Sequence, residues 1–122
     1  MRRPDPNTRL RHMLDAAREA QGFAAGRERG DLDTDRMLAL TLFRLLEVVG
    51  EAASAIPGDF RTAHPEIPWR AIIGMRNRLI HAYHDIDADI VWETVTHNLT
   101  PLISAIERIF NNDNNDNNAG GA

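Results

Sequence analysis

The sequence predicts an all-α fold, an antiparallel up-and-down bundle of four to five helices. Apolar residues recur at helical spacing in four segments, no segment alternates convincingly as a strand would, and the connections are short. The chain has 122 residues, of which 43% are hydrophobic, enough for one domain with one core. We expect the bundle to span residues 1–110. The Asn-rich residues 111–122 have almost nothing to bury and are expected to form a disordered tail.

The first two predicted helices cover about residues 7–23 and 33–56. Asn7 or Thr8 is suited to cap the first, because a short polar side chain can accept a hydrogen bond from the first turn. Pro57 and the glycine after it end the second, and another helical turn can follow before Pro65. The apolar stripe of the second helix consists of Leu38, Leu42, Leu45, Val49 and Ala53.

The third predicted helix, from about residue 69 to 83 or 84, carries an arginine on its apolar face. At about 100° per residue, Arg76 falls in the middle of the apolar arc and Tyr83 on the same face. A charge in a packed stripe needs a partner or a polar cleft. In one interpretation, Arg76 pairs with Glu47 or Glu51 of the second helix; in the other, its planar guanidinium holds a phosphate.

His81 lies at the side of the same predicted helix, four residues after Asn77, so that Asn77 could orient its imidazole. Arg78 shares that side, and His84 shares the edge of His81 one turn on. A histidine can take a proton from a ribose 2′-hydroxyl, and a nearby arginine such as Arg76 can stabilise the charge on a phosphorane. A lone histidine on a helix is more often simply solvated or hydrogen-bonded.

The fourth predicted helix starts after Asp87 or Asp89 and reaches about residue 110, with a kink or break caused by Pro101 near residues 98–100. The preceding turn allows a second interpretation, a metal site, because several possible ligands are closely spaced there. The acidic side chains also suit a polar turn and helix N-cap, which we favour. The possible ligands are His81, His84, Asp85, Asp87 and Asp89.

Charge and composition restrict the function further. The formal net charge is −4, from 14 basic and 18 acidic residues, so any nucleic-acid role must rest on a local basic site. No cysteine is present, which is compatible with a reducing cytoplasm. No apolar run approaches the ~18 residues of a membrane span. We expect a soluble, cytoplasmic protein without a membrane partner.

The segment Met75-Arg76-Asn77-Arg78-Leu79-Ile80-His81-Ala82-Tyr83 resembles the Arg-x4-His-x-Tyr signature of HepT-like toxins, a branch of the HEPN-fold proteins. Residues 46–53, 67–69, 85–87 and 91–92 also resemble family sequence, in the same order and spacing. The resemblance extends from the first predicted helix to Phe110. His84 and the Asn-rich tail depart from what we expect of the family.

The resemblance implies a HEPN-like bundle that homodimerises, with the motifs of two subunits facing one cleft. It implies endoribonuclease cleavage of RNA without a metal or other cofactor, with Arg76 and His81 as the matching catalytic positions and cyclic-phosphate products. It also implies a toxin neutralised by an MNT-type nucleotidyltransferase antitoxin that adenylylates the motif tyrosine, here Tyr83. Such an addition would place negative charge beside Arg76. The alternative is a non-catalytic HEPN-like binding partner of a nucleotidyltransferase.

Overall fold

The computed structural model describes residues 5–80 and 85–120, with side chains as far as Asp113. It confirms the all-α prediction: the described ranges contain helices and one isolated antiparallel bridge between Ile80 and Ile86, but no strand. The elements in chain order are α1 (Pro6–Ala24), α2 (Asp31–Thr34), α3 (Arg36–Ala55), α4 (Gly58–Ala63), α5 (Trp69–Met75), α6 (Ala88–Glu93), the π-helix η2 (Thr94–Asn98) and α7 (Leu99–Gly120).

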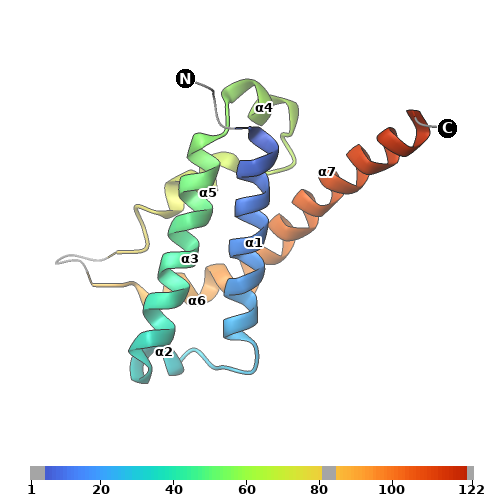
Figure 1. Ribbon diagram of the computed structural model, residues 1–122. Helices are drawn as coiled ribbons and strands as arrows, with labels where there is room; N and C mark the ends of the chain where they lie inside the picture. Colours follow the sequence, from blue (N-terminus) through green and yellow to red (C-terminus); the bar gives the residue numbers. More distant parts are fainter. Residues whose placement is uncertain (1–4, 81–84, 121–122) are drawn as a thin grey trace.

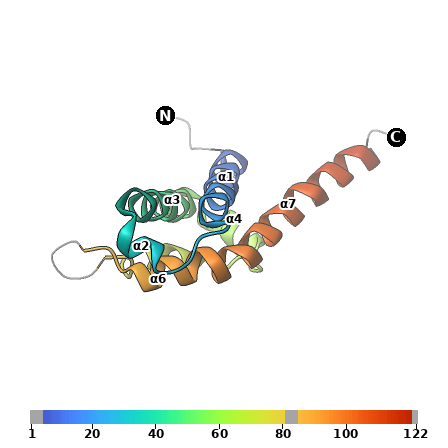
Figure 2. The same cartoon turned by 90° about the horizontal axis from the view of Figure 1, so that it is seen from below.

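Helices α1 and α3 lie side by side and antiparallel, and the α6–η2–α7 segment crosses one face of this pair (Figures 1 and 2). The distal part of α7 extends away from the other helices (Figure 1). None of the helices in the described part of the chain is long and apolar enough to cross a membrane.

Aspartates cap the two long N-terminal helices. The Asp5 carboxylate accepts a hydrogen bond from the Asn7 amide at 3.0 Å, so the cap of α1 lies two residues before Asn7 and three before Thr8, the predicted caps. The Asp35 carboxylate accepts one from the Leu38 amide at 3.1 Å. The backbone of Asp35 is extended, and the predicted second helix is therefore divided into the single turn α2 and the long helix α3.

The core lies where the faces of α1, α3 and the C-terminal helices meet. Four of the five residues of the predicted stripe on α3 are buried, and Leu45 is half-buried. Burial of a large aliphatic side chain stabilises the fold by about 1.5–3 kcal/mol, so this layer fixes the position of α3. The largest fully buried side chains are Leu10, Met13, Leu14, Leu42, Leu46, Val49, Ile56, Ile67, Leu79, Val91, Val95 and Ile106.

The predicted disturbance at Pro101 takes the form of a π-helix. Leu99 donates its amide to the Thr94 carbonyl, five residues earlier, in the turn just before the proline. In an α-helix the proline ring would clash with the carbonyl of His97, and a wider turn avoids that contact. Gln21 of α1 reaches this turn, donating to Thr100 Oγ1 at 2.9 Å and to the Val95 carbonyl at 3.4 Å.

The Asn-rich segment was expected to be disordered, whereas the structure continues α7 through its backbone to Gly120. Extending an existing helix requires no new nucleation, and no proline or glycine interrupts residues 102–119. The division of the chain into a bundle of residues 1–110 and a separate tail of residues 111–122 stays a prediction.

Candidate functional site

The predicted length of the third helix, from about residue 69 to 83 or 84, is wrong. Helix α5 ends at Met75, and a turn follows in which Asn77 donates to the Gly74 carbonyl at 3.2 Å and Arg78 to the Met75 carbonyl at 2.9 Å. These bonds span three residues and tighten the end of the helix. The next residue, Leu79, is fully buried.

Tertiary contacts redirect the chain after this turn. The Leu79 carbonyl accepts a hydrogen bond from the Asp87 amide at 2.7 Å, whereas in a continuing helix it would accept from residue 83. Ile80 and Ile86 then form the antiparallel bridge. The helical wheel therefore does not describe residues 76–80. The expected helical pairing of Asn77 with His81, and of Arg76 with Tyr83, involves residues outside the described ranges and stays a prediction.

Arg76 caps the C-terminus of α5 and is exposed, not centred on a packed stripe as predicted. Its aliphatic stem crosses α3 at the buried Gly50, whose lack of a side chain makes room for the Arg76 Cγ and Cδ. This contact holds the stem against a rigid helix while the residue stays exposed. The solvent exposure removes the desolvation cost that would have required a buried partner.

Neither Glu47 nor Glu51 is that partner. Both lie near Arg44, whose Nη1 is 3.7 Å from Glu47 Oε1 and 3.4 Å from Glu51 Oε1. Within the described ranges neither glutamate forms an ion pair with Arg76, so that prediction is wrong. The salt-bridged edge expected from these glutamates and Arg44 is confirmed. The Arg76 guanidinium thus forms no ion pair with a carboxylate among the described side chains.

Arg76 and Asn77 line one open pocket of about 430 Å³, together with Glu47 and Ile73 and with Ile80, which is 37% exposed. The pocket therefore combines the Arg76 cation, an amide, apolar walls and the Glu47 carboxylate, which lies nearer to Arg44. An unpaired guanidinium in such a place can bind a phosphate through two parallel hydrogen bonds. Among the described residues, this pocket agrees best with the predicted cleavage of RNA.

The other predicted site residues are placed differently. Arg78 lines another pocket, of about 330 Å³, with Met75 and residues of η2 and α7, so the structure does not bring it together with Arg76. His81, Tyr83 and His84 lie outside the described residues. Their predicted roles stay predictions.

Two of the acidic residues after the motif, Asp87 and Asp89, have structural partners. The Asp87 carboxylate caps α6 by accepting a hydrogen bond from the Ile90 amide at 3.1 Å, as the polar-turn interpretation predicted. Asp89 Oδ1 accepts one from Arg29 Nε at 2.6 Å. The side chains that the structure describes include no group of three potential metal ligands, and both histidines of the metal hypothesis lie outside them.

Sequence reasoning missed the role of Gly50 at this site. A glycine inside a helix costs roughly 1 kcal/mol relative to alanine. An isolated glycine in the middle of the 20-residue helix α3 is therefore a signal that another group passes close by. The sequence alone could have indicated a close neighbour at Gly50, but it could not have identified that neighbour as Arg76.

The family is decided by comparison with known proteins. Residues 13–109 match the family model described as "Ribonuclease HepT-like". The chain belongs to this family. The predicted HepT-like assignment and all-α HEPN-like fold are thereby confirmed, and the predicted ribonuclease function agrees with the family at this coarser level.

Named relatives agree with this assignment. "Probable ribonuclease HepT" of Thermococcus cleftensis is 40% identical over 79 residues, which are 65% of this chain and 72% of the relative. A "Putative RNase" of Caldanaerobacter subterraneus subsp. tengcongensis is 32% identical over 105 residues, 86% of this chain and 94% of the relative. Another "Putative RNase", of Methanocaldococcus jannaschii, is 30% identical over 107 residues, 88% of this chain and 98% of the relative. No solved structure matches the chain.

Proposed function

We propose that this protein is an endoribonuclease toxin that cleaves RNA without a metal ion, with Arg76 and His81 as catalytic residues. The observation that supports this most is the exposed Arg76 guanidinium, which borders an open pocket and has no carboxylate partner among the described residues. In a member of the ribonuclease HepT-like family, a positioned and unneutralised cation is what phosphate chemistry requires.

The proposed reaction uses the 2′-hydroxyl of the RNA as nucleophile. His81 accepts the 2′-hydroxyl proton, the 2′-oxygen attacks the adjacent phosphorus, and the bond to the 5′-oxygen of the next nucleotide breaks. The departing 5′-oxygen takes up a proton, so the products are a 2′,3′-cyclic phosphate and a 5′-hydroxyl. Arg76 stabilises the negative charge of the phosphorane. Asn77, which shares the Arg76 pocket, contacts the substrate, and we assign substrate-binding roles to Arg78 and His84 as well.

Cleavage assays with purified protein test this proposal. We expect RNA to be cut in the presence of EDTA, to give cyclic-phosphate ends, and to stay intact with His81→Ala. Equal amounts of intact RNA with wild type and His81→Ala, over several substrates, would contradict it. Cleavage that EDTA abolishes and Mg²⁺ or Zn²⁺ restores would contradict the metal-independent mechanism.

We propose further that two copies of the chain bring their motifs to one cleft. Exposed apolar side chains support this: Ile80 lines the Arg76 pocket, and Met37 and Leu40 are 80% and 42% exposed on α3. Light scattering should give twice the chain mass for wild type. A Met37→Glu and Leu40→Glu double variant should be monomeric and inactive. A wild-type monomer that cleaves RNA would contradict the dimeric site.

An MNT-type nucleotidyltransferase antitoxin is the partner that we propose, with Tyr83 as the residue that it adenylylates. Attaching AMP would add a negative charge that competes with RNA phosphate for Arg76. After co-expression with a candidate nucleotidyltransferase, the peptide containing Tyr83 should gain the mass of one or more AMP units, and Tyr83→Phe should gain none. Modification at another residue would overturn this assignment. We propose that the protein acts in the cytoplasm, where its RNA substrate and such an antitoxin would meet it.

The net charge of −4 favours a second candidate function, a non-catalytic partner of a nucleotidyltransferase, because it suits a protein surface at least as well as an RNA groove. The cleavage assay separates the two. A chain that binds the nucleotidyltransferase but leaves RNA intact is the binding partner.

A further inference from the structure

Two groups of four arginines stand out in this acidic chain. Four of them, on α1, on α3 and in the connection between α1 and α2, form ion pairs with carboxylates: Arg18, Arg27, Arg29 and Arg44. The segment 61–78 holds four more arginines and one carboxylate, Glu66, which is 3.2 Å from His64 Nδ1. No arginine of this segment forms an ion pair with a side chain in the described ranges. The segment is therefore a local basic region.

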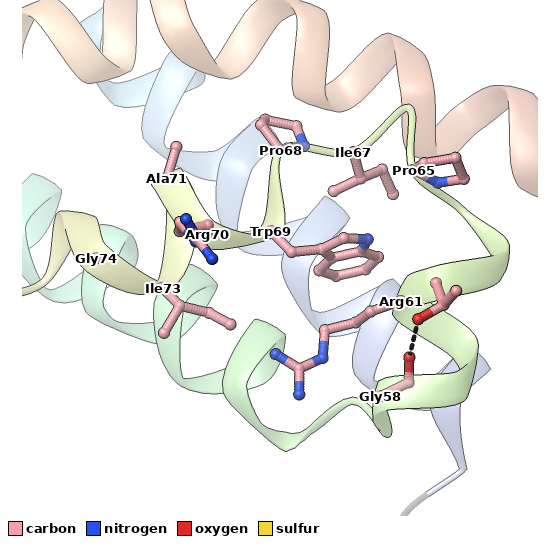
Figure 3. A pocket seen from close by; sticks show the side chains of 11 residues that line it. Gly58, Arg61, Pro65, Ile67, Pro68, Trp69, Arg70, Ala71, Ile73 and Gly74 are labelled. Atoms are coloured by element: carbon pink, nitrogen blue, oxygen red, sulfur yellow. Dashed lines mark hydrogen bonds between the residues drawn. The ribbon is translucent and has the colours of Figure 1, made fainter.

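Two of these arginines enter a large open pocket between α4 and α5, with a volume of about 1110 Å³. Figure 3 shows the Arg61 side chain extending from α4 toward Ile73, with Arg70 on the α5 side of the same pocket. Arg61 Nε is buried without a hydrogen-bond partner among the described residues, so no protein acceptor explains its position.

The wall of this pocket is fixed by local contacts. Trp69 is 8% exposed, and its indole Nε1 donates to the His64 carbonyl at 2.9 Å, which ties the start of α5 to the end of α4. Thr62 Oγ1 donates to the Gly58 carbonyl at 2.9 Å within α4 (Figure 3). The two arginines therefore extend from braced elements, and a ligand meets a cavity that already exists.

The α4–α5 pocket adjoins the proposed catalytic pocket. Ile73 lines both: on one side with Arg61 and Arg70, on the other with Arg76 and Asn77. One extended ligand can therefore occupy both pockets. A nucleic-acid strand is such a ligand, because it carries a phosphate on every nucleotide and a guanidinium recognises phosphate in a planar, paired geometry.

We propose that the α4–α5 pocket is a second RNA-binding site, in which Arg61 and Arg70 hold phosphates of the strand outside the scissile linkage. This rests on the proposed function, because it takes the Arg76 pocket as the place of cleavage. The two arginines are positioning residues: they increase affinity for longer RNA and take no part in the chemical step.

Binding to RNA tests the pocket without cleavage. In a His81→Ala background, the Kd of a single-stranded oligonucleotide of about 12 nucleotides is measured over a range of salt concentrations. Arg61→Gln with Arg70→Gln should weaken binding by about tenfold, and losing two phosphate contacts should lower the slope of log K against log salt by about 1.4. The control removes two exposed arginines elsewhere, Arg36→Gln with Arg108→Gln, and should change the Kd less than about twofold.

Cleavage by the otherwise wild-type chain tests the positioning role. The Arg61→Gln, Arg70→Gln variant should raise KM for the long oligonucleotide by about tenfold with kcat almost unchanged, because only uniform binding is lost. A dinucleotide is too short to fill both pockets, so its kcat/KM should be that of wild type. An equal loss on both substrates would overturn the positioning role.

The two proposals can fail separately. The second site would be overturned if the Arg61→Gln, Arg70→Gln variant kept the RNA affinity and salt slope of wild type, even if wild type cleaves RNA. That result would favour carboxylates of a protein partner as the ligands of the pocket. If wild type cleaves no RNA, the proposed function fails. The binding measurement then still decides whether the α4–α5 pocket takes RNA.

Discussion

A Cβ atom placed on Gly50 would lie 2.6 Å from both Cγ and Cδ of Arg76. Ordinary contacts of a Cβ atom are 3.4–4 Å, so any other residue at this position must displace the arginine stem or the helix beneath it. Gly50 of α3 thus determines where the side chain that follows α5 can lie.

Gly50→Ala should lower RNA cleavage by at least about tenfold, because even a small displacement of a catalytic group is costly. Alanine is the better helix former by about 0.5–1 kcal/mol. This gain should offset the cost of displacing the Arg76 stem, so the free energy of unfolding should change little. Urea denaturation and cleavage kinetics measure the two effects. The matched control is Gly22→Ala in α1, where an added Cβ meets no atom within 4 Å and activity should be unchanged. A fully active Gly50→Ala would contradict the proposed role of the crossing.

Arg76→Lys should reduce cleavage by about 10²–10³-fold, since lysine retains the charge but loses the planar pair of donors. Arg76 is exposed and has no ion pair within the described ranges, so the unfolding free energy should stay within about 0.5 kcal/mol of wild type. Kinetics and chemical denaturation of the same preparation check both. A large loss of stability would show that the arginine is mainly structural.

Gln21→Ala should destabilise the fold by about 1 kcal/mol, because the Val95 carbonyl of the π-helix and Thr100 Oγ1 at the start of α7 lose their hydrogen bonds. Thermal denaturation measures the loss. Glu19→Ala, at an exposed position of the same helix, is the control and should have almost no effect. If the two variants melt alike, the contact with the π-helix contributes nothing.

The free energy of unfolding should decrease in acid, partly because the Asp35 carboxylate becomes protonated. The hydrogen bond from the Leu38 amide, and then that from Arg27, hold the pKa of this carboxyl below its ordinary value of 3.8. A carboxyl with a lowered folded-state pKa stabilises the fold above 3.8, and this contribution is lost as the pH falls through the folded-state pKa. Asp35→Asn keeps a capping side chain without a titrating group.

Urea midpoints of wild type and Asp35→Asn, measured between about pH 5 and pH 2, test this. The difference in favour of wild type should shrink as the pH falls below 3.8. Asp15→Asn, which removes a charge at an exposed position of α1, serves as the control for charge. A constant difference between wild type and Asp35→Asn over the whole range would show that the cap does not titrate as expected.

Deleting residues 114–122 should leave the melting temperature within about 2 °C of wild type, because the described packing contacts of α7 end before the deletion. Arg18 pairs with Glu107, and the Arg11 guanidinium lies 4.3 Å from the centroid of the Phe110 ring. A variant that lacks residues 107–122 loses both contacts, and its melting temperature should be much lower. If the shorter deletion is equally harmful, the Asn-rich segment is part of the bundle.

The sequence by itself determined the helical fold and the core face of α3. Leu42, Val49 and Ala53 recur at helical spacing, and a helix with this pattern must bury that face. It also located the disturbance at Pro101, because the missing amide and the ring of proline act on the chain's own neighbouring residues. It identified the segment around Arg76 by its resemblance to family sequence.

Only the tertiary structure decided the end of α5 and the surroundings of Arg76. Periodicity continues past Met75, but burial of Leu79 and its hydrogen bond with Asp87 redirect the backbone there. The room for Arg76 comes from Gly50, a residue of another helix. Periodicity reflects preferences within one helix, whereas these contacts join residues that do not belong to the same helix. Their energies outweigh the weak preference of a few residues to remain helical.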